Sequence, residues 1–286
     1  MQNKIILITG ATGGIGKQTA LTLAKMGAHI AITGRNKSNG EAAITEIKQA
    51  SGNPNIDLLL ADISTQAGVH LLADQFKVKF DRLDVLINNA GLASSERKLT
   101  KDGIESNFAV NVVAPFLLTH LLLDRLKASV SARVVNLTGG EHPDKIELDN
   151  LQAERSFAGL NSYSHAKLIM MAVMYEFARR VQGTNVSINV CYPGQASTAM
   201  TQSVTAEMLP ASMRFIYPLF KWVTRPDQGK SAAKASKSSV YLASSVEVTG
   251  VTGKYFNPKC KEVNWPQAIL DAGTRQHLWD ILAKYQ

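Results

Sequence analysis

A glycine-rich turn between the first apolar run and the first helical pattern limits most strongly what this chain can fold into. The run Ile5-Ile-Leu-Ile8 leads into Thr9-Gly10-Ala-Thr12-Gly13-Gly14-Ile15-Gly16. Gly10 permits a tight turn, Gly14 lets backbone N–H groups approach a pyrophosphate, and Gly16 lets a helix pack closely on the strand. The N-terminus of that helix adds partial positive charge. The turn therefore predicts a dinucleotide site, and residues 10–16 are its first candidates.

Short apolar runs alternate with helical patterns along the rest of the chain. Most of these runs are continuous rather than alternating, as expected for parallel strands that are covered on both faces. The predicted strands are Lys4–Thr9, Ala28–Thr33, Ile56–Ala61, Asp84–Asn88, Ala132–Thr138, Val186–Cys191 and a short one at Tyr255-Phe256. The predicted helices cover about residues 14–26, 38–50, 65–79, 104–129, 162–182, 228–243 and 274–284.

This alternation predicts an α/β fold, a Rossmann-type doubly wound parallel sheet of about seven strands with helices on both faces. No linker or internal repeat divides the chain, so residues 1–286 are expected to form one domain. Its nucleotide-binding half covers about 1–95, and its catalytic and substrate-binding half about 96–286.

Residues 199–227 interrupt the alternation with an apolar insertion that is broken by Pro210 and Pro218. Such a segment, placed after the sixth strand, is a candidate lid over a substrate pocket. A pair of helices that packs in a dimer or against the core explains it equally well.

Cysteine content and charge exclude several classes of protein. Two cysteines, Cys191 and Cys260, are too few for a disulfide framework, lack metal-ligand spacing and suit a reducing compartment. No signal peptide and no apolar run long enough to span a bilayer is evident, so a cytoplasmic protein is expected. The net charge of +8 is concentrated in residues 214–262, with nine Lys/Arg against three acids, but the basic residues are scattered and favour a solvated surface over a nucleic-acid site.

The end of the second strand bears on which nucleotide is bound. An acid at this position would accept the 2′-hydroxyl of NAD, but the chain has Gly34-Arg35-Asn36 and no acid before Glu41. Arg35 can form charge-assisted hydrogen bonds to a 2′-phosphate, so NADP(H) is favoured over NAD(H). Asp62, followed by Ile63, is placed to accept from the adenine amino group, or to act as an acid at a helix N-terminus.

Tyr163 and Lys167 lie four residues apart in a predicted helix and therefore share one face. A neighbouring ammonium favours the phenolate and lowers the pKa of a tyrosine, which would suit it to acid–base chemistry near neutral pH. The pair alone is common on protein surfaces.

Several further motifs accompany this pair in order along the chain: Asn88-Asn89-Ala90-Gly91, Asn111 and Pro193-Gly194. With the glycine-rich turn, they resemble the short-chain dehydrogenase/reductase family over nearly the whole chain. The segments Gly16-Lys17, Asp149-Asn-Leu-Gln152, Gly253-Lys-Tyr-Phe256 and Leu278-Trp279 are similar to the retinol-dehydrogenase-like branch of that family.

The resemblance implies roles for individual residues. Tyr163 would exchange a proton with the substrate oxygen, Lys167 would bind the nicotinamide ribose and lower the Tyr163 pKa, and Asn111 would hold a water that links Lys167 to solvent. The stretch Asn89-Ala90-Gly91 would line the adenosine side of the cleft, and Thr198, after Pro193-Gly194, would meet the carboxamide.

The sequence departs from the family pattern at two places. Gly139 stands where the family has its catalytic serine, and the neighbouring Thr138 is the favoured replacement if a small register shift brings its hydroxyl into place. Pro115 stands four residues after Asn111 and has no N–H, so the Asn111 carbonyl would be free for a water relay, or the proline simply kinks a long helix.

The leading hypothesis is an NADP(H)-dependent oxidoreductase that interconverts a carbonyl and an alcohol on a small apolar substrate, without a metal. The alternative is a weakly active or inactive nucleotide-binding or redox-sensing protein, and the glycine at position 139 favours this alternative. By analogy with the family, a homo-oligomer built through the helices at 104–129 and 162–182 is expected. A lesser hypothesis is that Phe215–Val223 lies at an anionic bilayer surface.

Overall fold

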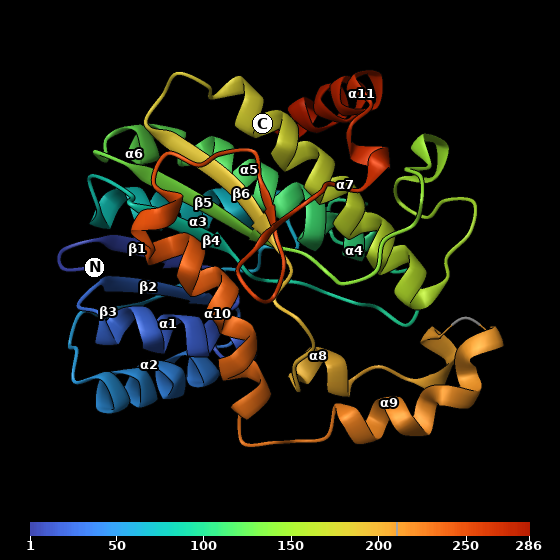
Figure 1. The fold of residues 1–286 in the computed structure, drawn as a ribbon, viewed down its shortest axis with the longest axis horizontal. Coiled ribbons are helices and arrows are strands. Elements are labelled where there is room, and N and C mark those ends of the chain that lie inside the picture. The colour runs from blue at the N-terminus through green and yellow to red at the C-terminus, as the bar shows by residue number, and fades with distance from the viewer. Residues whose placement is uncertain (210) are drawn as a thin grey trace.

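The computed structural model describes residues 1–209 and 211–286, and its centre is one eight-stranded sheet (Figure 1). The strand order is β3-β2-β1-β4-β5-β6-β7-β8, and every neighbouring pair is parallel except β7 and β8. The strands are β1 Ile5–Ile8, β2 His29–Gly34, β3 Ile56–Leu60, β4 Val85–Asn88, β5 Ala132–Leu137, β6 Val186–Cys191, β7 Tyr255–Phe256 and β8 Glu262–Val263. The predicted doubly wound parallel sheet is confirmed.

The eighth strand corrects the expected number of about seven. It is antiparallel to β7, is two residues long, and pairs Glu262 with Phe256 and Val263 with Tyr255. A strand this short at the sheet edge has no buried apolar run, so no periodicity in the sequence indicates it.

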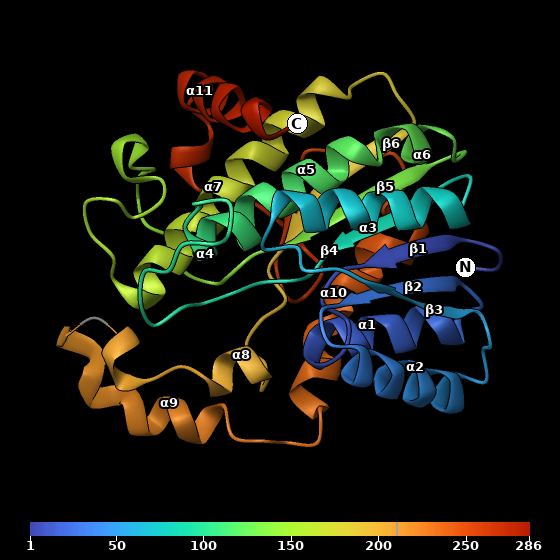
Figure 2. The same ribbon diagram turned by 180° about the vertical axis from the view of Figure 1, so that it is seen from behind.

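Helices cover both faces of the sheet (Figures 1 and 2). One face is packed by α1, α2 and α10, and the other by α3, α5, α7 and α11. The α-helices are α1 Gly14–Lys25, α2 Lys37–Ser51, α3 Gln66–Lys79, α4 Ser106–Phe108, α5 Ala114–Leu121, α6 Leu123–Lys127, α7 Gly159–Arg180, α8 Ala199–Gln202, α9 Tyr217–Val223, α10 Lys230–Ser244 and α11 Ala272–Leu282. The central strands are buried by both layers, which explains their continuous apolar sequences.

The single helix predicted over 104–129 is instead divided into shorter pieces. A π-helical turn, Ala109–Val113, separates α4 from α5, and Leu122 separates α5 from α6. A π turn directly before Pro115 has a physical reason, because proline offers no N–H to the carbonyl four residues earlier. For the break at Leu122, within Leu121-Leu-Leu123, we have no physical account.

The 199–227 insertion forms a separate arm beside the carboxyl ends of the strands (Figure 1, gold and orange). It contains α8, two short 3₁₀ segments, Ala206–Met208 and Ala211–Ile216, and α9. Pro210, one of the two prolines that break its sequence, lies outside the described residues. In the described part of the chain no helix combines the length and the apolar character needed to cross a bilayer.

Candidate active site

A cleft of about 450 Å³ opens at the carboxyl ends of the strands. It lies where the strand order reverses between β1 and β4, with β2 and β3 on one side and β5 and β6 on the other. Ligands of open α/β sheets bind at this kind of reversal, because the loops diverge there and leave a crevice. The topology alone therefore identifies the cleft as the main candidate site.

The glycine-rich turn forms the floor of the cleft. Gly10 has φ +64°, and a Cβ there would lie 2.9 Å from Ala90 Cα, so a side chain fits neither the conformation nor the space. Gly14 has φ +54° and begins α1, whose N-terminus faces the cleft. No heavy atom comes within 4 Å of a Cβ built on Gly13, so this backbone is open to a ligand. The turn is shaped to receive phosphates at a helix N-terminus.

Hydrogen bonds join this turn to the loop after β4. The Thr9 hydroxyl accepts from the N–H groups of Asn89 (3.1 Å) and Ala90 (3.0 Å). The Asn89 amide donates to the carbonyls of Thr9 (2.8 Å) and Gly10 (3.0 Å). Asn89 therefore holds the two loops at a fixed separation, and this positions the floor of the cleft.

Of the residues expected to select the nucleotide, two line the cleft and one caps a helix. Arg35 lines the cleft next to Gly34, whereas the side chain of Asn36 accepts from the Asn39 N–H and caps α2. Asp62 also lines the cleft, and its carboxylate accepts from the Ser64 N–H at 3.1 Å. Arg35 and Asp62 are thus available to a ligand, while Asn36 has a structural task.

Tyr163 and Lys167 lie on one face of α7, and both line the cleft. Lys167 Nζ is buried, donates to the Leu137 carbonyl at 3.0 Å and lies 5.9 Å from the centre of the Tyr163 ring. Burial lowers the pKa of Lys167 to about 8. Burial, with a smaller contribution from Tyr192, raises the pKa of Tyr163 to about 12. The expected lowering of the Tyr163 pKa is therefore absent, because desolvation disfavours the charged form of the buried phenol.

Asn111 approaches Lys167 from the π turn. Its side-chain amide donates to the Leu92 carbonyl (2.7 Å) and accepts from the Leu92 N–H (3.2 Å). A Cβ on Gly91 would lie 3.3 Å from Asn111 Oδ1 and 3.6 Å from Lys167 Nζ. Gly91 thus leaves the space in which these two side chains come together.

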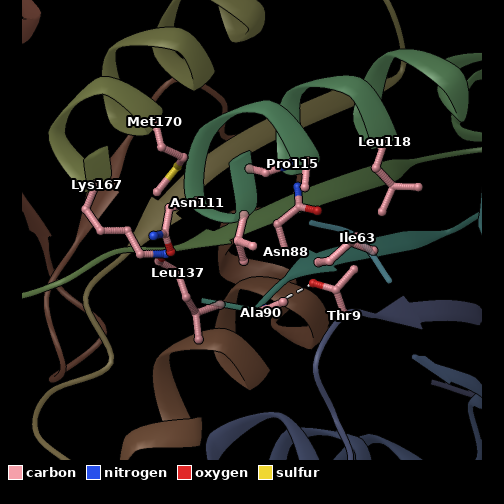
Figure 3. A pocket seen from close by; sticks show the side chains of 12 residues that line it. Thr9, Ile63, Asn88, Ala90, Asn111, Pro115, Leu118, Leu137, Lys167 and Met170 are labelled. Atoms are coloured by element: carbon pink, nitrogen blue, oxygen red, sulfur yellow. Dashed lines mark hydrogen bonds between the residues drawn. The ribbon is translucent and has the colours of Figure 1, made fainter. Parts of the chain in front are cut away.

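A second, much smaller cavity of about 10 Å³ lies behind this contact (Figure 3). Lys167 and Asn111 reach toward each other at one side of it, and Asn88 and Pro115 line it further along. Asn88 Oδ1 is buried and has no hydrogen-bond partner among the described residues. A space of this size and polarity is about the minimum that holds one water. The cavity matches the place where a water relay to Lys167 is expected.

The place of the missing serine is defined by Gly139. A Cβ built on Gly139 would lie 3.4 Å from Tyr163 Cε1 and 3.7 Å from Tyr163 Oη, so a side chain there would face the tyrosine hydroxyl. Thr138 also lines the cleft, but its hydroxyl donates to Met171 Sδ at 3.1 Å. The Thr138 N–H bonds to the Cys191 carbonyl and continues the ladder between β5 and β6. The register shift expected to turn Thr138 toward Tyr163 is therefore not present.

The 199–227 arm closes the cleft from the other side. Thr198 caps α8 with its hydroxyl and lines the cleft, and a Cβ built on Gly14 would lie 3.0 Å from the Thr198 methyl group. The inward face of the arm forms a small apolar cluster at Tyr163. Its members are Ala93, Leu160, Tyr163, Met200, Val204, Met208 and Phe220.

Most of the residues predicted for the site come together. Those that line the main cleft are Gly10, Thr12, Gly13, Gly14, Ile15, Gly16, Arg35, Asp62, Ile63, Asn89, Ala90, Gly91, Thr138, Tyr163, Lys167, Pro193 and Thr198. Asn111 lines the small cavity, and Asn36 and Gly194 line neither. Leu92, Val110 and Met200 line the cleft without having been predicted, since an apolar residue that faces a ligand cannot be told from one that faces the core by sequence alone.

These features fit a bound dinucleotide. The cleft offers glycine backbone at a helix N-terminus, a cation beside Gly34 and a buried lysine at the opposite end. A Cβ on Gly34 would lie 2.5 Å from the Thr12 methyl group, so the narrow strand end also needs glycine. The described residues contain no group of His, Cys, Asp and Glu side chains arranged to hold a metal ion.

Comparison with known proteins agrees with this geometry. Residues 4–209 match the sequence profile of the family described as short chain dehydrogenase. The chain is 34% identical to mouse retinol dehydrogenase 12 over 279 residues, which covers 97% of this chain and 84% of that protein. It is 34% identical to human retinol dehydrogenase 13 over 278 residues (96% and 82%), and 32% identical to human polyprenol dehydrogenase over 284 residues (97% and 83%).

Solved structures share the fold. An uncharacterized protein from Mycobacterium paratuberculosis superposes with a TM-score of 0.76 at 24% identity, over 99% of this chain and 93% of that one. A short chain dehydrogenase from Escherichia coli CFT073, complexed with NADPH, gives a TM-score of 0.68 at 24% identity, over 91% and 98%.

Proposed function

Since the chain belongs to the short-chain dehydrogenase/reductase family, in its retinol-dehydrogenase-like branch, we propose that it is an NADP(H)-dependent reductase of apolar aldehydes or ketones. The observation that carries the proposal is the meeting of Tyr163 and Lys167 with the glycine-rich turn in one cleft. Interconversion of a carbonyl and an alcohol is the chemistry of this family, and NADP(H) and the substrate class are the proposed refinements.

Preference for NADP(H) is supported by Arg35. Its side chain lines the cleft at the end of β2, where the sequence has no acid to accept a ribose hydroxyl. A guanidinium forms two parallel hydrogen bonds to a phosphate and would favour a 2′-phosphate over a hydroxyl. When bound, the reduced nicotinamide supplies the hydride.

Residues of the chain donate the proton to the substrate. With its pKa raised to about 12, Tyr163 carries its proton at neutral pH and can donate it to a carbonyl oxygen. This favours reduction as the working direction, because oxidation needs the phenolate. Lys167 adds a positive charge below its pKa of about 8, and the Asn111 and Asn88 cavity offers a path by which the proton is replaced.

An apolar substrate body is supported by the cluster at Tyr163. Leu160, Met200 and Phe220 belong to α7 and to the 199–227 arm, and they place aliphatic and aromatic surface beside the proton donor. We propose that the arm acts as a lid which excludes water from the reacting carbonyl.

The position of Gly139 favours a second candidate function. A catalytic hydroxyl at residue 139 would face Tyr163, yet the chain has none there, and the Thr138 hydroxyl is bonded to Met171. A protein that binds NADP(H) as a redox sensor, with little turnover, would tolerate this loss. The intact Tyr163, Lys167 and Asn111 favour the enzyme.

The deciding experiment measures NADPH and NADH oxidation against a panel of apolar aldehydes and ketones. We expect turnover with NADPH that Tyr163→Phe abolishes and Thr138→Val leaves within a few fold. Arg35→Ala should reduce kcat/KM for NADPH about 10- to 100-fold and change that for NADH little, since one charge-assisted contact is lost. Lys37→Ala, an exposed cation nearby, serves as the matched control. NADPH binding without turnover across the panel would favour the sensor.

Two further expectations stay predictions. A cytoplasmic location agrees with both cysteines being free, Cys191 buried and Cys260 partly exposed. A homo-oligomer is proposed by analogy with the family, and sedimentation velocity of the purified protein measures it.

A further inference from the structure

The outward face of the 199–227 arm carries a stripe of exposed apolar side chains. It consists of Phe215, Leu219, Trp222 and Val223, which are 81%, 60%, 61% and 49% exposed. These are four of the twelve large hydrophobic side chains exposed in the described part of the chain, and they fall within nine residues. Spacings of four and three residues place Phe215, Leu219 and Trp222 along one side of α9 and its preceding turn. We call these four residues the outer stripe.

The opposite side of α9 is fixed to the protein. Phe220 packs into the apolar cluster at Tyr163, and the Tyr217 hydroxyl donates to the Val204 carbonyl at 3.2 Å. One face of α9 is therefore packed against the protein, and the outer stripe lies on a second face that is exposed. A helix with one face packed and an apolar second face has a surface suited to a partner.

Cations flank the outer stripe. Between Glu207 and Asp227 the sequence has Arg214, Lys221 and Arg225 and no acid. The Arg225 guanidinium lies 5.3 Å from the centre of the Trp222 ring, and Lys221 Nζ lies 5.9 Å from that of Tyr217.

Arg214 lies near one acid, Glu207. A hydrogen bond from Thr205 and, more weakly, the charge of Arg214 lower the pKa of Glu207. Lys221 is exposed and donates to the Gln202 carbonyl at 2.8 Å. The segment thus joins aromatic and aliphatic groups to cations, and the charge of Lys221 and Arg225 is not neutralised within it.

We infer that the outer stripe docks on the surface of an anionic phospholipid bilayer. Apolar and aromatic side chains on one face of a short helix enter the boundary between head groups and acyl chains, while Lys and Arg remain among the anionic head groups. A second copy of this chain fits the face less well. A two-fold contact through this face would bring the cations of one copy near the cations of the other, with no acid in the segment to pair with them.

Docking in this way would place the active site beside the membrane. The outer stripe and the cluster at Tyr163 lie on opposite faces of one helix, so a substrate dissolved in the bilayer would have a short path under the arm. This consequence rests on the proposed function, whereas the docking itself does not.

The test is flotation of the full chain with phosphatidylcholine vesicles, with and without phosphatidylglycerol. We expect binding only when the anionic lipid is present, release by high salt, and a blue shift of tryptophan emission that Trp222→Phe abolishes. Leu219→Glu with Trp222→Glu should abolish flotation. Lys221→Gln with Arg225→Gln should weaken the partition coefficient about fivefold for each cation.

Matched controls separate docking from unfolding and from general charge. Val78→Glu changes an apolar side chain on α3 that is 90% exposed, and Lys101→Gln with Lys127→Gln removes two exposed cations elsewhere. The controls should float like the unchanged protein, and every variant should keep its Tm and its turnover of a water-soluble aldehyde. Absence of flotation with anionic vesicles overturns the inference, as does equal loss in the controls. A concentration-dependent dimer that Trp222→Glu dissociates, without vesicle binding, would instead identify a second copy as the occupant.

Discussion

At the scale of single residues, Gly139 is the most informative position in the active site. The φ angle of Gly139 is not in the left-handed region, and a Cβ there meets Tyr163 only at ordinary contact distance, 3.4 Å. Serine is therefore sterically allowed, and its hydroxyl would lie next to the proton donor. We expect Gly139→Ser to raise kcat for carbonyl reduction about tenfold, since loss of one such donor costs about 10²- to 10³-fold in other enzymes.

Gly139→Ala separates the hydroxyl from the added carbon. It places the same Cβ beside Tyr163 but donates no hydrogen bond, so its kcat should stay near that of the unchanged protein. Steady-state kinetics with one good substrate measures both variants. Equal rates for the serine and alanine variants would show that the missing hydroxyl does not limit the reaction.

Lys167 determines the response to pH. Because burial lowers its pKa to about 8, its positive charge is present below pH 8 and is lost as the pH rises through that value. Tyr163, with a pKa of about 12, remains protonated over the same range. We expect kcat/KM for reduction, which reports on the free enzyme, to fall above pH 8. Lys167→Arg keeps its charge to about pH 12, so its activity should be lower but should no longer fall near pH 8. A fall that remains near pH 8 in this variant would assign it to another group.

At the scale of elements, the interrupted helix around Asn111 connects sequence to catalysis. Pro115 offers no N–H to the Asn111 carbonyl, the preceding turn is π-helical, and both residues line the small cavity. Pro115→Ala would restore this N–H and favour a regular α-helix, whose bond would occupy the carbonyl. We expect kcat to fall several-fold, KM to change little and Tm to stay equal or rise. Pro218→Ala, in the first turn of α9, is the control. An unchanged kcat would contradict a role of this carbonyl in the relay.

The elements differ in how far the sequence predicts them. The sequence predicts the ends of strands β1 to β6 to within one or two residues, because strands buried on both faces need continuous apolar runs. The glycine-rich turn is also predicted correctly, because its conformation depends on its own residues. The break at Leu122 and the pairing of β8 have no local pattern in the sequence. The pKa values of Tyr163 and Lys167 belong to the same class. Their spacing predicts that they are neighbours, but only the folded protein shows that desolvation dominates.

At the scale of the whole molecule, the active site and a stabilising network lie at opposite ends of the strands. The cleft lies at the carboxyl ends, while Asp84 is buried at the start of β4 on the opposite edge. Its carboxylate accepts from the Ile5 N–H (2.8 Å), the Ser129 hydroxyl (2.7 Å) and Lys4 Nζ (3.0 Å). One side chain thus joins the beginnings of β1 and β4 to the residues before β5. This arrangement predicts that stability and activity can be changed separately.

Asp84→Asn tests this separation. Burial alone would raise the pKa of Asp84, but the hydrogen bonds from Ile5, Ser129 and Lys4 outweigh it and lower the pKa below the ordinary value. The carboxylate therefore contributes stability that is fully present above about pH 4 and is lost as the pH falls toward the lowered pKa. Breaking a buried charged network typically costs about 3 kcal/mol or more, so we expect Asp84→Asn to lower Tm by about 5 °C or more at neutral pH.

The variant should also lose less stability than the unchanged protein as the pH falls below about 4, because the titrating group is gone. The KM for NADPH should not change, since the cleft lies at the other edge of the sheet. Asp81→Asn, an exposed acid three residues earlier, should leave Tm within about 1 °C. Thermal unfolding across this pH range, with the KM for NADPH measured on the same samples, makes the comparison. A rise in KM together with the fall in Tm would mean that the two edges of the sheet are coupled through the strands, and that the catalytic cleft depends on Asp84 after all.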